Sequence, residues 1–155
     1  MSFRIRGLDP EPYQPLFDLS DEALAQRGVR RMTADVPFSA PCRVSLEDAE
    51  PGERLLLLSY LHQGAATPFR QAGPIFVREG ARQAYDAADR IPSAFARRML
   101  SARAYDGEGM MLEGDLVNGP ELGPLLETWL ARPEVDVVHL HYARRGCYAG
   151  LAVRA

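Results

Sequence analysis

The chain has 155 residues, 46% of them hydrophobic, which is a size and composition typical of one globular domain. Its formal net charge of −3 provides no basic patch of the kind that nucleic acid requires. No apolar run approaches the roughly 18 residues of a membrane-spanning helix. We therefore expect a partner other than nucleic acid or a membrane. The two cysteines and the absence of an apolar leader predict free thiols in a cytoplasmic protein.

The N-terminal part predicts one strand and one capped helix. Residues Phe3–Ile5 read as a short edge strand. Ser20 is a typical N-cap before two acidic residues, and Gly28 stands where a C′ glycine belongs, so a short helix is expected between them. Residues 29–41 are expected to be irregular.

The stretch from Cys42 to Glu79 predicts the centre of the sheet. Apolar and polar residues alternate over 42–46 as in a half-buried strand. Residues 53–61 are apolar on both faces, which favours a central strand that is covered on both sides. Residues 74–79 supply a third strand.

Helices and strands then alternate towards the C-terminus. Residues 81–90 and 93–99 have helical patterns, and 100–106 and 110–117 read as the two strands of a hairpin. Between Leu122 and Leu130, four leucines and Trp129 form one apolar helical stripe. Together the patterns predict an α+β fold in a single domain: a mainly antiparallel β-sheet of six to eight strands with three or four short helices.

The last twenty residues predict a hairpin in which residues 135–142 and 147–154 are joined by the loop 143–146. A register with Tyr142 opposite Cys147 and Leu140 opposite Ala149 gives one continuously apolar face. Its members are Val138, Leu140, Tyr142, Cys147, Leu151 and Val153. The opposite face then carries His139, His141, Tyr148, Gly150 and Ala152.

Three histidines make a candidate site. His139 and His141 point the same way on one strand, and His62 lies at the end of the central strand. Three imidazoles can bind zinc or another transition metal. In the alternative interpretation, the histidines bond ordinary neighbours on a partly exposed sheet face. The spacing matches neither a cupin nor a histidine-triad hydrolase, because Arg144 and Ala143 occupy the positions where those need further ligands.

Other polar side chains are further candidates for a ligand site. Tyr148 and Arg78 are candidates for contact with a small ligand beside the histidines. All 18 basic residues are arginine, a bias typical of a GC-rich genome, so arginine abundance alone does not indicate a phosphate ligand. Four acids within seven residues read as a solvated loop: Glu47, Asp48, Glu50 and Glu53. No glycine-rich nucleotide loop is present, and no catalytic residue is assigned.

The order of these motifs resembles that of a known family. The string runs from Cys42 to Glu53, through an apolar strand with His62, Gly73–Glu79 and Gly109–Met111, to the closing segment His139–Tyr148. It is similar to domain-of-unknown-function family 1203, a bacterial family of uncharacterised proteins of about this length. The resemblance implies a single-domain bacterial protein and brings no activity or catalytic residue with it.

Two classes of function remain open. The first is a small-ligand or metal-binding domain, with or without enzymatic activity, whose pocket lies over the His139/His141 face. The second is a non-enzymatic protein-interaction or self-associating module, such as a homodimer formed through an edge strand or the Trp129 helix. Whether His62 shares a concave pocket with the other two histidines separates the two.

Overall fold

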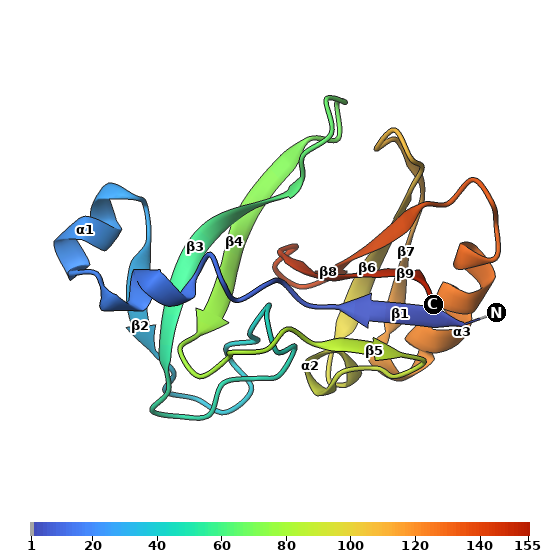
Figure 1. The fold of residues 1–155 in the computed structure, drawn as a ribbon. Helices are drawn as coiled ribbons and strands as arrows, with labels where there is room; N and C mark the ends of the chain where they lie inside the picture. Colours follow the sequence, from blue (N-terminus) through green and yellow to red (C-terminus); the bar gives the residue numbers. More distant parts are fainter. Residues whose placement is uncertain (1) are drawn as a thin grey trace.

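The computed structural model describes residues 2–155, which form two antiparallel β-sheets with short helices around them (Figure 1). The larger sheet has the order β5-β1-β9-β8-β6-β7, and the smaller has the order β2-β3-β4. The larger sheet contains β1 (Phe3–Arg6), β5 (Asp86–Ala88), β6 (Met99–Tyr105), β7 (Met111–Asn118), β8 (Val137–Tyr142) and β9 (Tyr148–Arg154). The smaller contains β2 (Arg30–Thr33), β3 (Arg54–Gln63) and β4 (Gln71–Arg78). The predicted α+β class is confirmed, but the expected single sheet is instead two.

The helices are short, as expected. They are α1 (Asp21–Gln26), α2 (Ser93–Ala96) and α3 (Leu122–Leu130), with 3-10 turns η1 (Gln14–Asp18) and η2 (Gly119–Glu121). The predicted caps of α1 are confirmed: Ser20 Oγ accepts a bond from the Ala23 amide at 3.1 Å, and Gly28 has a φ of 70°. Among residues 2–155, no helix combines the length and apolarity needed to cross a membrane.

Helix α3 covers one face of the larger sheet, as predicted from its apolar stripe (Figure 1). Leu126 and Trp129 are buried there with Val138 and Leu140 of β8. Because the Trp129 side chain is only 6% exposed, it belongs to the core and offers no surface for a partner.

Three local predictions were wrong because long-range pairing overrides local propensity. Residues 81–90 are not helical; they contain β5, which pairs with β1. Since β1 pairs with β9 on its other side, it is an internal strand and not an edge. Residues 29–41 are also not wholly irregular, because β2 pairs there with β3.

The segment Pro41–Asp48 is a set of turns and not a regular strand, although Cys42, Val44 and Leu46 are buried as their alternation predicted. Its backbone bonds in several directions instead of along one ladder. The amide of Arg43 donates to the carbonyl of Phe76 in β4 at 2.9 Å, and the Arg43 carbonyl accepts from Leu8 at 2.8 Å. We call Pro41–Asp48 the bridging segment.

The C-terminal hairpin forms, but its register differs from the predicted one. Leu140 lies opposite Gly150 and His141 opposite Tyr148, so Ala149 is an extra residue in β9. His139, His141 and Tyr148 therefore share a face, as predicted. Residues 150–153 change sides relative to the prediction. Gly150 and Ala152 face the core with Val138 and Leu140, while Leu151 and Val153 lie half-buried on the histidine side.

Replacing Trp129 with alanine should lower the free energy of unfolding by about 3–5 kcal/mol, because it removes a large core aromatic. Since Trp129 is the only tryptophan, unfolding in denaturant should be followed by circular dichroism and not by fluorescence. The exposed neighbour Glu127→Ala is the control, with a change within about 0.5 kcal/mol. A loss below about 1 kcal/mol for Trp129→Ala would show that the ring does not pack in the core.

Gly7→Ala tests the close approach of the chain after β1 to the bridging segment. A Cβ at Gly7 would lie 2.1 Å from the carbonyl oxygen of Val44, so backbone must move. We expect a loss of about 3 kcal/mol or more in denaturant unfolding. Gly73→Ala in β4 is the matched control, because nothing lies within 4 Å of its Cβ position, and it should change stability by less than about 1 kcal/mol.

Candidate metal centre

The three histidines of the chain converge between the two sheets. His62 comes from β3 of the smaller sheet, and His139 and His141 come from β8 of the larger. One ring nitrogen from each lies within 4.8 Å of the others. Since the chain has three histidines in all, none lies elsewhere. The structure thus brings together the three residues that the sequence nominated as metal ligands.

Irregular strand pairing occurs next to these side chains. The pairing of β3 with β4 shifts register at His62, and that of β8 with β9 shifts between Leu140 and His141. The pairing of β6 with β7 shifts at Tyr105, which packs on His139 with ring centroids 4.8 Å apart. Bulges turn a side chain away from the regular pleat and are frequent beside functional sites. In β3 the extra residue is His62 itself, whereas in the other two pairs it is Ala149 of β9 or Leu112 of β7, on the strand that pairs with the one carrying His141 or Tyr105.

Aromatic rings enclose the histidines. The Tyr148 ring stacks on His62 at 5.5 Å with an interplanar angle of 7°. His62 meets His141 edge to face at 4.8 Å. The side chains of His139 and His141 are buried, and His62 is partly buried. The cluster is therefore enclosed, because the smaller sheet covers the His139/His141 face, which was expected to border a pocket. A surface hollow lies elsewhere, beside Arg97 and Asn118.

Each of the three rings has a buried nitrogen without a hydrogen-bond partner. His141 Nδ1 lies 2.9 Å from the carbonyl oxygen of Gly146, and since a carbonyl only accepts, Nδ1 carries the proton. His141 Nε2 is then an unprotonated acceptor, and it is buried with no partner. The Nδ1 atoms of His62 and His139 are also buried without partners. Such buried unsatisfied atoms are rare and often mark the place of an ion or water.

Burial keeps the rings neutral. Desolvation lowers the pKa of His139 to about 4, helped by the nearby His62 and Arg103. Desolvation lowers the pKa of His141 to about 3, although the Gly146 bond opposes the change. The pKa of His62 is lowered by the same causes, burial first and Arg103 second. At neutral pH all three imidazoles are therefore in the form that binds metals.

Sequence reasoning missed Arg103 as a site residue. It lies on β6 directly opposite His139 of β8, so it shares the histidine face. Its Nη1 donates to Gln71 Oε1 at 3.3 Å, across to the smaller sheet. The alternation of Ser101, Arg103 and Tyr105 indicates that they share a face, but only the pairing of β6 with β8 puts that face beside the histidines.

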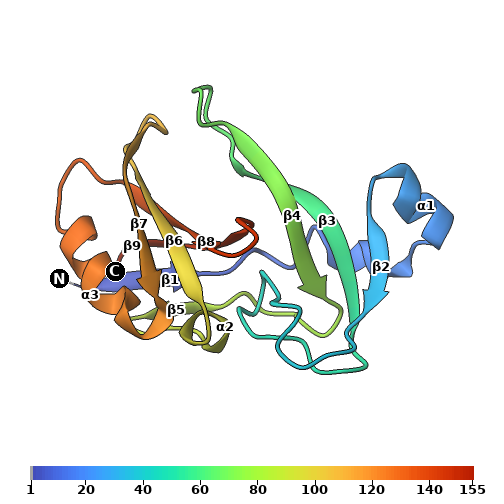
Figure 2. The ribbon, with the colours of Figure 1, turned by 180° about the vertical axis from the view of Figure 1, so that it is seen from behind.

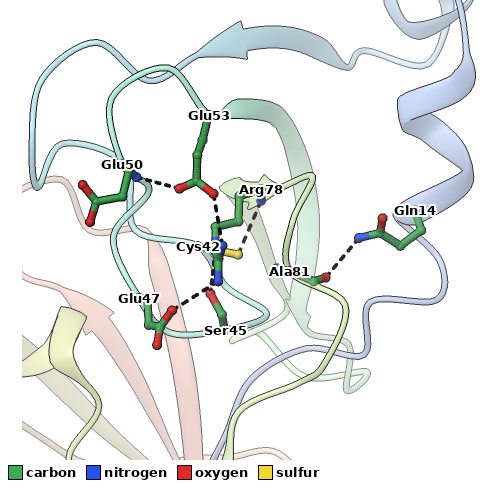
Figure 3. A network of polar contacts seen from close by, with 8 residues as sticks. All are labelled: Gln14, Cys42, Ser45, Glu47, Glu50, Glu53, Arg78 and Ala81. Atoms are coloured by element: carbon green, nitrogen blue, oxygen red, sulfur yellow. Dashed lines mark hydrogen bonds and ion pairs between the residues drawn. The ribbon is translucent and has the colours of Figure 1, made fainter.

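Arg78 does not belong to this site, which corrects the prediction. It pairs with Leu55 near the start of β3, whereas His62 lies near the end of that strand. Its guanidinium is occupied by Ser45, Glu47 and Glu53, as Figure 3 shows. The loop that carries Glu47 and Glu53 therefore forms ion pairs with Arg78 and is not the merely solvated loop that had been predicted.

The remaining candidates have structural environments. Asp48, with 6% of its side chain exposed, pairs with Arg98 at 2.6 Å. Cys42 and Cys147 are free thiols, as predicted. Burial raises the pKa of Tyr148, and neighbouring Tyr60 raises it further, so its hydroxyl stays protonated at neutral pH. Tyr148 therefore contributes its ring face to the cluster, and its hydroxyl is a neutral group in the metal-free protein.

The fold and the cluster define a class: an α+β protein whose two antiparallel sheets enclose three histidines. The family described as "Protein of unknown function (DUF1203)" matches residues 39–154, and the chain belongs to it. The matched range includes all three histidines and Arg103. Neither the curated proteins nor the solved structures yielded a match.

The metal-free protein should lose stability in acid. His139 and His141 have a lower pKa in the folded state than the roughly 6.5 of the unfolded chain, so the unfolded state binds more protons below that pH. The stability that the two neutral histidines contribute to the folded state is complete above about pH 6.5, and it declines as the pH falls towards 4. Denaturant titrations in chelator from pH 7.5 to 4.5 would measure this loss.

His139→Gln isolates one histidine from the carboxylates that also titrate. Between pH 6 and 5, the free energy of unfolding of this variant should fall less steeply than that of the parent, by roughly 1 kcal/mol per pH unit. Parallel curves for the two proteins would contradict a buried, neutral His139.

Proposed function

We propose that this protein binds one divalent transition-metal ion, with zinc as the first candidate, through His62, His139 and His141. The observation that carries the proposal is the convergence of all three histidines from two sheets, each with a buried ring nitrogen that has no partner. Ordinary histidines on a sheet face would satisfy these nitrogens with neighbours or solvent, whereas within residues 2–155 only His141 Nδ1 has a hydrogen-bond partner, the Gly146 carbonyl.

The ligand set favours some metals over others. Neither a carboxylate nor a thiolate joins the three rings in the described part of the chain, which disfavours calcium and magnesium. Imidazole suits zinc, copper, nickel and iron. The bond from His141 Nδ1 to the Gly146 carbonyl is the second contact that metal-binding histidines usually make, because it fixes the tautomer and the ring orientation.

The geometry requires a small contraction. Two nitrogens bound to zinc at about 2.1 Å in a tetrahedron are about 3.4 Å apart, whereas the ring nitrogens here are separated by up to 4.8 Å. A movement of roughly 1 Å by the side chains would close the difference. His62 is the natural residue to move, since it lies at the irregular end of β3.

Three protein ligands are typical of a zinc ion that also holds water or a small ligand, whereas structural zinc sites use four. The site is therefore suited to bind a small molecule at the metal. Since its ligands come from both sheets, a bound ion would also tie the sheets together and stabilise the fold by mass action.

Metal analysis of protein produced without a polyhistidine tag tests the proposal. We expect about one equivalent of zinc per chain after incubation with Zn²⁺ and gel filtration, and a rise in Tm on adding Zn²⁺ to chelator-treated protein. His62→Ala should abolish both effects. This variant is preferred because His62 is less buried than the other two, and circular dichroism would verify its fold.

Tyr148→Phe is the matched control. It keeps the ring that stacks on His62 and removes a hydroxyl that we do not assign as a ligand, so the zinc content should equal that of the parent. Parent protein with no bound zinc and an unchanged Tm would refute the metal centre, as would a His62→Ala protein that binds zinc like the parent.

A further inference from the structure

We propose that the metal centre takes a small oxyanion, a carboxylate or a phosphate, and that Arg103 holds this anion beside the ion. The inference rests on the proposed metal centre and adds the chemical class of its ligand. It depends on four features of the structure: the position of Arg103, its contacts, the sign of its charge and the walls of the site.

Arg103 is placed by the sheet itself. Strand β6 lies between β7 and β8, and Arg103 is the direct cross-strand partner of His139. Residues opposite one another in an antiparallel pair have neighbouring side chains on the same face. The positive charge of Arg103 acts on all three rings, since it contributes to the lowered pKa of His62, His139 and His141.

The guanidinium has no anionic partner within residues 2–155. Its contacts are neutral: Gln71 Oε1 at 3.3 Å, Ser101 Oγ at 3.5 Å and the hydroxyl of Tyr105. The distances to Gln71 and Ser101 are at the long end for hydrogen bonds. In contrast, the described ion pairs employ Arg4, Arg6, Arg31, Arg54, Arg78, Arg98 and Arg132. Arg103 is thus a partly buried cation whose donors are only weakly engaged.

A cation beside three metal ligands is unfavourable for metal binding unless an anion lies between them. An oxyanion resolves the conflict, because one oxygen can bind the metal while another accepts hydrogen bonds from the guanidinium. The planar fork of arginine matches carboxylate and phosphate oxygens in pairs. Gln71 accepts a long hydrogen bond from Arg103. It can give up that bond, and its side-chain amide can then donate a hydrogen bond to the anion.

The walls of the site restrict the anion to a small one. Phe69 packs on Tyr105, which packs on His139, while Tyr148 covers His62. The tips of the β3–β4 and β6–β7 hairpins approach each other above the gap between the sheets (Figures 1 and 2), and Thr67 Oγ1 donates to the Gly109 carbonyl at 3.1 Å. With aromatic rings on these sides and the hairpin tips in contact, a small anion such as acetate or inorganic phosphate is favoured over a polymer.

Cobalt-loaded protein tests the proposal, because the visible absorption of Co²⁺ changes when its ligands change. Co²⁺ uptake is measured first, for the parent, Arg103→Gln and Arg103→Lys. All three should take up one equivalent, since Arg103 is not a metal ligand. Phosphate, and separately acetate, is then titrated at constant ionic strength set with perchlorate. The parent spectrum should change saturably with at least one of the two anions, and the stronger one identifies the ligand as phosphate or carboxylate.

Arg103→Gln should weaken the binding of that anion at least tenfold, and Arg103→Lys should recover part of the affinity by restoring the charge. A merely structural Arg103 would alter Tm and leave the anion affinity unchanged. Cobalt uptake with a spectrum that neither anion alters, or equal affinity in the parent and Arg103→Gln, overturns the anion proposal alone. A parent protein that takes up neither zinc nor cobalt overturns the metal centre, and the anion proposal with it.

Discussion

The bridging segment Pro41–Asp48 is the constraint on which the two-sheet structure depends. Leu46 is buried in the core of the larger sheet, whereas Cys42 and Val44 are buried in that of the smaller. Arg43 is only 2% exposed between them, and its Nε donates to the Tyr148 carbonyl at 2.7 Å. Burial lowers the pKa of this guanidinium, and no carboxylate pairs with it among the described ion pairs. Backbone carbonyls and the Tyr142 ring, 5.0 Å away, solvate its charge instead.

This constraint extends to the histidines through Tyr148. Its carbonyl is held by Arg43, and its ring stacks on His62, so one residue connects the bridging segment with the cluster. His62 and His141 belong to different sheets and share no strand pairing. The distance between these two histidines therefore depends on how the sheets are joined, and the bridging segment joins them. The geometry of the site is a property of the whole fold and not of one hairpin.

The sequence predicted features whose causes are local. The cap at Ser20, the stripe around Trp129 and the shared face of His139 and His141 depend on residues a few positions apart. The prediction of which face of the sheet carries Gly150 and Ala152 was wrong. A single extra residue, Ala149, reverses the alternation of β9, and nothing in the local pattern marks it. The place of Arg103 could not be read at all, because it depends on β6 pairing with β8 across some 35 residues of intervening chain.

Left without partners, the buried nitrogens of the histidine cluster would make the fold less stable than a plain core would be. Each buried ring nitrogen without a partner costs about 1–3 kcal/mol, so three of them cost an amount comparable with the roughly 5–15 kcal/mol by which a domain of ordinary size is stable. Three apolar side chains would fill the same space between the sheets without that penalty. The register shifts at His62 and His141 likewise interrupt ladders that could have been regular. A ligand that engages the three nitrogens removes the penalty, and an anion at Arg103 balances the remaining charge.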